Sequence, residues 1–175
     1  MFKEERRELM FDWSMLGDIG EGRPNLGMTM NVAVYRLMQF TLRDVLIREY
    51  GVAEADRIFF EAGKKAGEEF FRHNLEGCRD FDELTVRLQE DLREYRIGIL
   101  RFERTEPENG EFTITVAEDL DCSGLPISDE TICTYDEGFL SGILGEFFGR
   151  PFNVREVDCW CLGDRICRFE AKSNR

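Results

Sequence analysis

The chain has 175 residues, 42% of them hydrophobic and 34% charged, and it carries a formal net charge of −13 at pH 7. This length and composition suit one compact domain with its own core and argue against a disordered or fibrous chain. The acidic balance, with no concentrated basic patch, argues against general binding to nucleic acid or to anionic membrane surfaces.

No targeting or membrane segment is recognisable. Residues 1–7 lead into no apolar stretch of the secretory kind, and no apolar run approaches the ~20 residues that a membrane span needs. We therefore expect a cytoplasmic protein. In that reducing compartment, the six cysteines indicate metal or redox chemistry rather than a disulfide framework.

The first half of the chain predicts an arm followed by helices. Residues 1–29 are irregular, polar and punctuated by glycine, so we expect an N-terminal arm before a single domain over residues 30–175. A first helix is predicted from Asn31 to the glycine at position 51. Its apolar stripe consists of Tyr35, Met38, Leu42, Val45 and Leu46.

A second helix is predicted from Glu54 to His73. Small residues at its centre, Gly63 and Gly67, let another backbone approach closely, at some cost in helix propensity. The simpler interpretation of that spacing is packing within the chain, and the alternative is packing between subunits.

The third helix begins at Asp80, where Glu83 completes a capping-box pattern. The hydrophobic period then changes. Residues 97–104 and 111–117 are two strand-like runs joined by a glycine-containing turn, which predicts a hairpin.

A fourth helix is predicted from Thr134, which with Glu137 forms a second capping pattern. Two last strands cover residues 152–159 and 166–171. Helices followed by a hairpin, a helix and another hairpin predict the α+β class, with helices packed on a small antiparallel sheet.

Five of the six cysteines lie in the last third of the chain. Zinc prefers about four ligands in a tetrahedron, and thiolates are favoured donors. A C-terminal hairpin brings Cys159 and Cys167 together across its turn, and Cys133 arrives from the start of the fourth helix. These three residues indicate a structural zinc site that ties a helix to a hairpin.

The residues alone leave the fourth ligand open. Glu156 lies three residues before Cys159, and strict strand alternation places their side chains on opposite faces unless the strand bulges or ends there. Cys122 and Cys161 compete for the role. The alternatives to zinc are cysteines that are simply buried or free, or a redox pair of Cys159 with Cys161, which the CxC spacing supports poorly.

Four stretches carry a pattern that extends over residues 30–172. They are VYRLMQF at 34–40, AGKKAGE at 62–68, CTYDEGFLSGIL at 133–144 and CWCLGDRICRFE at 159–170. Together they resemble the 4-vinyl reductase domain family, and the last stretch, with its C-x-x-x-G-D-x-x-C-x-F-E pattern, is the most specific.

The resemblance implies both a fold and a ligand set. Family members include stand-alone archaeal and bacterial proteins and the sensory domains of phenol-responsive activators. They imply a fold similar to that of TRAPP subunits and NO-signalling ligand-binding domains, commonly dimeric. The spacing of the phenol sensors' zinc site implies Cys133, Glu156, Cys159 and Cys167 as ligands here, with Cys122 in reserve.

The family's phenol sensors hold the phenol hydroxyl with a histidine and a tryptophan. The resemblance points to His73, the only histidine, and to Phe112, near the position of that tryptophan, as candidate ligand-binding residues. Without those polar anchors, the site favours a wholly apolar or larger planar guest. The simpler interpretations are an exposed His73 at a helix end and a Phe112 in the ordinary core.

We predict a zinc-containing, homodimeric module that binds a small apolar or aromatic molecule in a sensory or regulatory role. The alternatives are an enzyme or accessory factor for tetrapyrrole vinyl reduction, and a dimeric scaffold subunit. An enzyme is less favoured, because the sequence has no dinucleotide fingerprint, P-loop or flavin motif to supply a hydride. A zinc ion closed by four protein ligands also leaves no open catalytic position.

Overall fold

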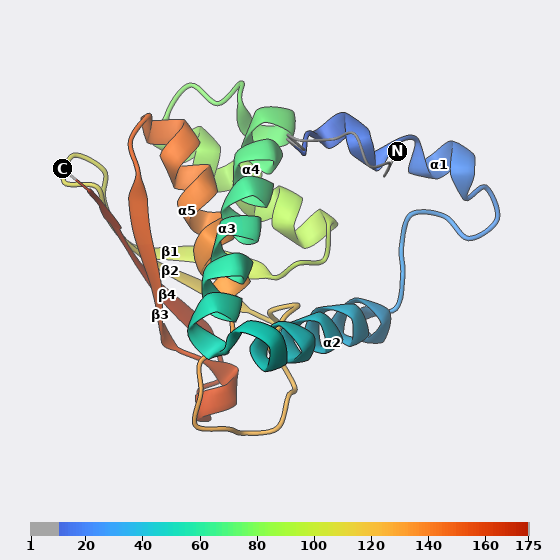
Figure 1. Cartoon of the computed structure of the whole chain (residues 1–175). Helices are drawn as coiled ribbons and strands as arrows, with labels where there is room; N and C mark the ends of the chain where they lie inside the picture. The colour runs from blue at the N-terminus through green and yellow to red at the C-terminus, as the bar shows by residue number, and fades with distance from the viewer. Residues whose placement is uncertain (1–10, 175) are drawn as a thin grey trace.

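The computed structural model of the chain describes residues 11–174 (Figure 1). Its long helices are α2 (Val32–Tyr50), α3 (Val52–Phe70), α4 (Phe81–Glu94) and α5 (Thr134–Phe148). Its strands are β1 (Ile99–Glu106), β2 (Glu111–Ala117), β3 (Phe152–Asp158) and β4 (Cys167–Ser173). Short turns of helix are η1 (Trp13–Leu16), α1 (Ile19–Gly22), the π-helical η2 (Phe71–Leu75) and η3 (Trp160–Leu162). The predicted α+β order of elements is confirmed.

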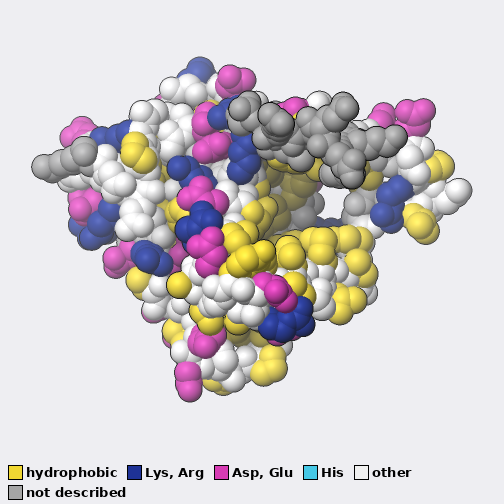
Figure 2. Space-filling view, in the orientation of Figure 1, with side chains coloured by type: hydrophobic (Ala, Val, Ile, Leu, Met, Phe, Trp, Pro, Cys, Tyr) yellow, Lys and Arg dark blue, Asp and Glu magenta, His cyan; other side chains and the backbone are white. Residues whose placement is uncertain are grey.

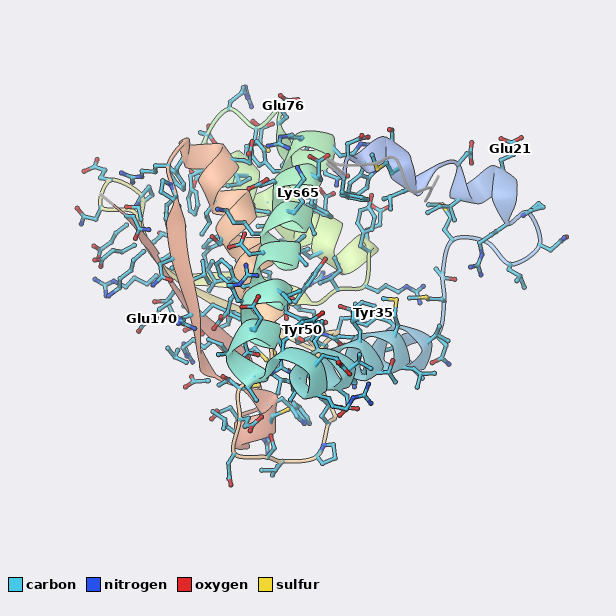
Figure 3. All side chains as sticks on the ribbon, in the orientation of Figure 1. Glu21, Tyr35, Tyr50, Lys65, Glu76 and Glu170 are labelled. Carbon is cyan, nitrogen blue, oxygen red and sulfur yellow. The ribbon has the colours of Figure 1, made fainter. Side chains whose placement is uncertain are left out.

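The four strands form one antiparallel sheet in the order β1-β2-β4-β3. Alternate side chains of β3 are buried, namely those of Phe152, Val154 and Glu156, while the residues between them are exposed. Helices cover the buried face, and Glu170 of β4 lies on the opposite side of the sheet (Figure 3). The sheet therefore has one core face and one solvent face.

Helix α5 lies between α3 and the sheet (Figure 1), and it meets α3 backbone to backbone. A Cβ atom on Gly63 would come within 2.0 Å of a carbonyl oxygen of α5, and one on Gly138 within 2.0 Å of a carbonyl oxygen of α3. Gly67 and Gly142 meet the facing helix in the same way, at 2.1 and 2.2 Å. The intramolecular interpretation of the glycine spacing is thus confirmed.

The two predicted helix caps have different outcomes. Asp80 caps α4 as expected, since its Oδ1 accepts the N–H of Glu83 at 2.9 Å. The cap at the start of α5 is wrong, because the N-cap residue is Cys133 and no side chain makes a capping bond there. The buried carboxylate of Glu137 instead accepts the N–H of Glu156 in β3 at 2.8 Å, so a tertiary contact replaces the local one.

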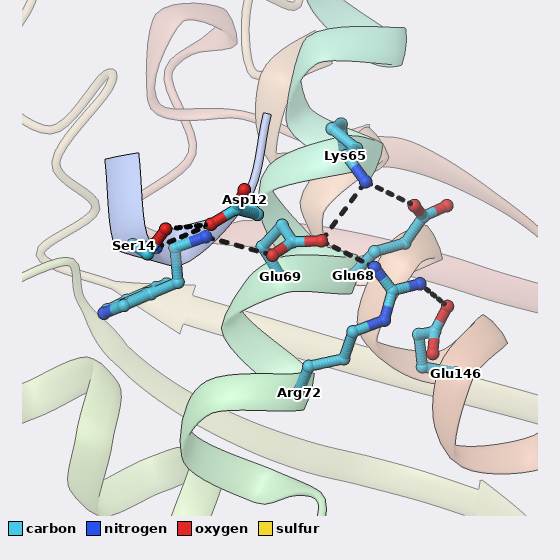
Figure 4. A network of polar contacts seen from close by, with 8 residues as sticks. Asp12, Ser14, Lys65, Glu68, Glu69, Arg72 and Glu146 are labelled. Carbon is cyan, nitrogen blue, oxygen red and sulfur yellow. Dashed lines mark hydrogen bonds and ion pairs between the residues drawn. The ribbon is translucent and has the colours of Figure 1, made fainter. Parts of the chain in front are cut away.

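The described part of the N-terminal arm is less irregular than predicted, since it contains η1 and α1. Its anchor is Trp13, which packs partly buried against the core, with its ring centroid 6.1 Å from that of Phe70. The N–H of Trp13 donates to Glu69 (3.1 Å), which also accepts bonds from Lys65 (3.2 Å) and Arg72 (2.6 Å) (Figure 4). Burial raises the pKa of Glu69, but these donors outweigh it and hold the pKa below its usual value.

Helix α2 packs on the rest of the chain with its more polar side. From the predicted apolar stripe, Met38, Leu42 and Val45 are 62%, 50% and 42% exposed, and neighbouring Leu37 is 68% exposed, whereas the buried residue of the helix is Gln39. Figure 2 shows hydrophobic side chains gathered over α2. This inverts the usual arrangement of an amphipathic helix. Even so, no helix within residues 11–174 is long and apolar enough to cross a membrane.

Candidate functional site

Four cysteine thiols meet at one end of the sheet. The Sγ atoms of Cys122, Cys133, Cys159 and Cys167 lie within 4.8 Å of one another, and all four side chains are buried. The sulfur of Cys133 is 4.0 Å from that of Cys159 and 3.9 Å from that of Cys167, while Cys122 and Cys167 are 3.0 Å apart. The structure therefore joins the reserve candidate to the three cysteines that the sequence singled out. We call these residues the thiol cluster.

Each thiol stands at the end of a different element: Cys122 after β2, Cys133 before α5, Cys159 after β3 and Cys167 at the start of β4. The register between β3 and β4 shifts between Glu156 and Asp158. Because of that irregularity, Glu156 and Cys159 are both buried on the core side, although strict alternation would separate them. The local irregularity that the sequence required is confirmed.

Glu156 lies against the thiol cluster. It is 9% exposed, its Oε2 accepts the N–H of Cys133 at 3.2 Å, and its Oε1 is buried without a hydrogen-bond partner among the described residues. A buried carboxylate oxygen without a donor is costly, so this atom is suited to a cation beside Cys133. The donor atoms that lie mutually within 4.8 Å nevertheless include Cys122 and do not include Glu156.

Further acids surround the thiols. Asp119 and Asp136 form with Cys133 a second group of donor atoms within 4.8 Å of one another. Burial, together with the charge of Asp121, raises the pKa of Asp119 to about 7, and burial beside Cys159 raises the pKa of Glu156 to about 8. Such shifts mean that the site disfavours negative charge and would favour a cation.

The thiols also act on one another. Hydrogen bonds from the other three thiols, that of Cys122 first, lower the pKa of Cys159 far below its usual value. The contact with Cys122 and then those with the other two thiols raise the pKa of Cys133. The four thiols are thus strongly coupled, and thiolate is the form of cysteine that binds metals.

The donor set fits a tetrahedral zinc ion. Zinc–sulfur bonds of about 2.3 Å in a tetrahedron place the sulfurs about 3.8 Å apart. Two of the recorded sulfur–sulfur distances, 3.9 and 4.0 Å, lie close to that value, whereas the Cys122–Cys167 distance of 3.0 Å is shorter, so these two sulfurs would have to move apart around an ion. Four protein donors would close the coordination sphere, so the chemistry supplied by the ion would be structural, linking the sheet to the start of α5.

The remaining two cysteines lie outside this group. Cys161 is 2% exposed in η3, and Cys78 is half-buried after η2. Neither belongs to the thiol cluster, and none of the six cysteines forms a disulfide.

The segment that carries Cys122 also holds α2. Both carboxylate oxygens of Asp121 accept bonds from α2, from the hydroxyl of Tyr35 at 2.8 Å and from the side-chain amide of Gln39 at 2.6 Å. The guanidinium of Arg36 donates to two carbonyl oxygens of the same segment at 2.8 and 2.9 Å. The sequence prediction placed Tyr35 on the apolar stripe and missed these bonds, which we call the polar tether of α2. Polar residues that interrupt an otherwise apolar helix could have indicated it.

Phe112 belongs to an aromatic cluster between the sheet, α4 and α5. The residue is 3% exposed in β2. Its ring centroid lies between 5.1 and 6.1 Å from the centroids of Phe81, Phe102, Phe148 and Phe152. Phe112 is therefore a core residue, packed among other aromatic rings.

His73 lies elsewhere, exposed in η2. Its ring stacks on that of Trp13, with centroids 4.2 Å apart and planes 12° from parallel. Among the described residues, no recorded contact joins His73 to Phe112, so the two candidate ligand residues are not brought together. The sequence prediction missed Trp13, and no local pattern signals a stack between residues so far apart.

Comparison with known proteins shows which family this chain resembles. The family model of the 4-vinyl reductase domain matches residues 112–173, the part of the chain that contains all four residues of the thiol cluster. A solved structure described as a vinyl-4-reductase family protein from Methanocaldococcus jannaschii is similar over 96% of this chain and 100% of its own, with a TM-score of 0.62 and 21% identity. The predicted resemblance to the 4-vinyl reductase domain family is confirmed.

Two other solved structures share the fold. The phenol-responsive sensory domain of the transcription activator PoxR, solved with phenol, has a TM-score of 0.66 and 14% identity, covering 84% of this chain and 76% of its own. Subunit 3 of the trafficking protein particle complex from Naegleria fowleri, covalently bound to palmitic acid, has a TM-score of 0.64 and 14% identity over 83% and 96%. At these identities the likeness shows the fold alone, and the predicted likeness to TRAPP subunits is confirmed.

Proposed function

We propose that this protein is a zinc-stabilised module of the 4-vinyl reductase domain type that binds a small apolar or aromatic molecule and acts as a homodimer. The observation that carries the proposal is the thiol cluster, which lies in the residues matched by the family model and offers four buried soft donors. In this proposal the metal is structural, and the organic ligand binds elsewhere in the domain.

In this proposal Cys133, Cys159 and Cys167 bind the zinc ion, and the fourth ligand is Cys122 or Glu156. The family resemblance favours Glu156, whereas the place of the Cys122 sulfur among the clustered donors favours Cys122. If Cys122 binds, Glu156 supports the site without touching the metal, through the bond that it accepts from the Cys133 N–H.

The organic ligand is proposed to bind among the rings around Phe112. Two observations support this placement. The chain contains 15 phenylalanines, and its fold is similar to that of a sensory domain solved with phenol. His73, which stacks on Trp13, is proposed as a further ligand-binding residue, and residues 1–29 are proposed as an N-terminal arm before the domain of residues 30–175. Trp13 and the ring of Phe70 beside it link the arm to the aromatic core.

Native mass spectrometry of protein purified without chelator tests metal and ligand together. We expect one zinc ion per chain and a small apolar compound on part of the population. Added naphthalene or phenol should raise the melting temperature, since a ligand at 100 times its Kd stabilises the folded state by ~2.7 kcal/mol. The variant F112L should weaken that response, and F59L, under Arg43 at the α2–α3 contact, should not. Zinc-loaded protein that carries no compound and responds to no aromatic probe would contradict the ligand-binding role.

The exposed face of α2 supports assembly, and it also favours the second candidate function, a dimeric scaffold. Leu37, Met38 and Leu42 expose half or more of their surface. On the same helix Tyr35, Arg36 and Gln39 bond to the segment after β2. An apolar face of this kind is costly in water, and a second copy presents the same face for a two-fold contact. We therefore propose that the α2 helices of two chains pack against each other.

Replacing Leu37 with glutamate is expected to convert the dimer to a monomer, because the contact would then bury two unpaired carboxylates. Light scattering coupled to gel filtration measures the mass directly. The matched control is I127E, at a residue that is 75% exposed in the loop before Cys133, and it should leave the mass unchanged. A monomeric parent protein, or a dimeric L37E variant, would contradict the proposed interface.

A further inference from the structure

A surface groove of about 480 Å³ opens between α2, the segment after β2 and the turn between β3 and β4. Its volume lies within the range of small-molecule sites, roughly 300–1,000 Å³. The groove is distinct from the thiol cluster and from the rings around Phe112, neither of which lines it. The lining residues that matter for its chemistry are Val32, Arg36, Arg96, Leu120, Trp160 and Arg165.

Three arginines from distant parts of the chain meet in this groove. Arg36 comes from α2, Arg96 from the turn after α4, and Arg165 from the turn between β3 and β4. In a chain with a net charge of −13, such a gathering is unexpected. None of the ion pairs recorded within residues 11–174 involves any of the three, although the charge of Arg36 favours the ionised form of nearby Asp121.

The lining remains positive when its acids are counted. Glu118 and Asp119 also line the groove. The Oδ1 atom of Asp119 already accepts the N–H groups of Asp121 at 2.8 Å and Cys122 at 3.1 Å. This carboxylate therefore stabilises the backbone of its own segment. Arg36 is held in place by the carbonyl oxygens to which it donates, which fixes one positive charge before any ligand arrives.

The rest of the lining is apolar. The indole N–H of Trp160 donates to the carbonyl oxygen of Leu125 at 3.1 Å, so the ring offers the groove an apolar surface rather than a donor. Val32 and Leu120 extend this surface. Val32 is the first residue of α2, and the positive end of a helix dipole favours an anion nearby.

We propose that this groove binds a small organic anion, with a flat apolar body against Trp160 and a carboxylate or phosphate group at the arginines. Guanidinium groups suit both anions because they can donate two parallel hydrogen bonds to either. The floor of the groove is the segment that carries Cys122 and tethers α2, so an occupant would rest directly on the link between the thiol cluster and the α2 face.

Nuclear magnetic resonance of the whole chain, purified without chelator, tests the proposal. The chain has two tryptophans, so it gives two indole N–H signals, and the variant W13F assigns them. Titration with 2-naphthoate or 2-naphthyl phosphate should shift the Trp160 signal to saturation, and the tighter of the two identifies the preferred anionic group. The neutral analogue 2-naphthamide should bind at least about tenfold more weakly, since one charge-assisted contact contributes on the order of 1.5–3 kcal/mol.

Arginine variants complete the test. R96Q and R165Q should each weaken binding of the anionic probe about threefold to tenfold, and the matched control R57Q, on α3 and paired with Glu54, should leave it unchanged. Both target arginines are exposed, so the fold should survive, and the unchanged remainder of the spectrum would show it. Equal binding of the amide, a shift of the Trp13 signal alone, or indifference to both arginine variants would overturn the proposal.

Discussion

Replacing Gly138 with alanine is expected to lower the free energy of unfolding by at least about 3 kcal/mol, the upper end of ordinary overpacking effects. The added Cβ would lie 2.0 Å from the carbonyl oxygen of Phe60 and 2.8 Å from the backbone nitrogen of Lys64. Both atoms belong to the backbone of α3, so no side-chain rotation relieves the contact. The two helices would have to separate along their whole interface. Urea unfolding followed by circular dichroism measures the loss.

The same helix supplies the control. Gly145 also lies in α5, but a Cβ there would meet nothing closer than 3.7 Å. The variant G145A should therefore gain helix propensity, up to about 1 kcal/mol. G67A, on the facing helix, should behave like G138A because its Cβ would lie 2.1 Å from the carbonyl oxygen of Phe139. Equal stabilities for G138A and G145A would contradict backbone-to-backbone packing.

Local signals predicted most of the fold. The alternation in β2, the cap at Asp80 and the glycine after α2 each depend on near neighbours in the sequence, and each element was found where it was expected. The spacing of Gly63 and Gly67 predicted close packing but not the partner. Two small residues on one helix allow close approach equally by another helix of the same chain, such as α5, or by a helix of another subunit. The cap of α5 failed for a related reason, since Glu137 bonds to a strand that follows it in the chain.

The candidate site was predictable only in part. Three thiols follow from the motif in the last hairpin and the start of α5, whereas Cys122 lies in a loop whose path no periodicity fixes. The stack of Trp13 on His73 and the bond from Tyr35 to Asp121 join residues 60 and 86 positions apart. The polar tether of α2 also explains why its apolar stripe faces outward. Hydrophobicity alone would have predicted that this stripe lies in the core.

Replacing Cys133, Cys159 or Cys167 with serine is expected to remove the zinc ion and most of the stability of the domain. Structural zinc binds zinc-finger peptides with about 10–16 kcal/mol, which is comparable to the whole stability of a domain. Elemental analysis gives the metal content per chain, and thermal unfolding with and without chelator gives the stability. The control C161S alters a buried cysteine of the same turn outside the thiol cluster and should retain zinc. Full zinc content in all three cluster variants would refute the site.

The fourth ligand is decided by comparing C122S with E156Q. If Cys122 binds the metal, C122S loses zinc, while E156Q keeps it with affinity reduced about 10–100-fold, as for a supporting residue. If Glu156 binds, the two outcomes are exchanged. The thiolate-to-metal absorption of the cobalt(II)-substituted protein counts the sulfur ligands independently.

The same two variants also test whether the metal site supports the dimer. Loss of the metal bond at Cys122 would free the segment on which Asp121 holds Tyr35 and Gln39 of α2. If Cys122 is the fourth ligand, C122S should therefore weaken the dimer together with the metal site. E156Q should leave the dimer intact, because the side chain of Glu156 bonds to the backbone of Cys133 rather than to the segment that holds α2.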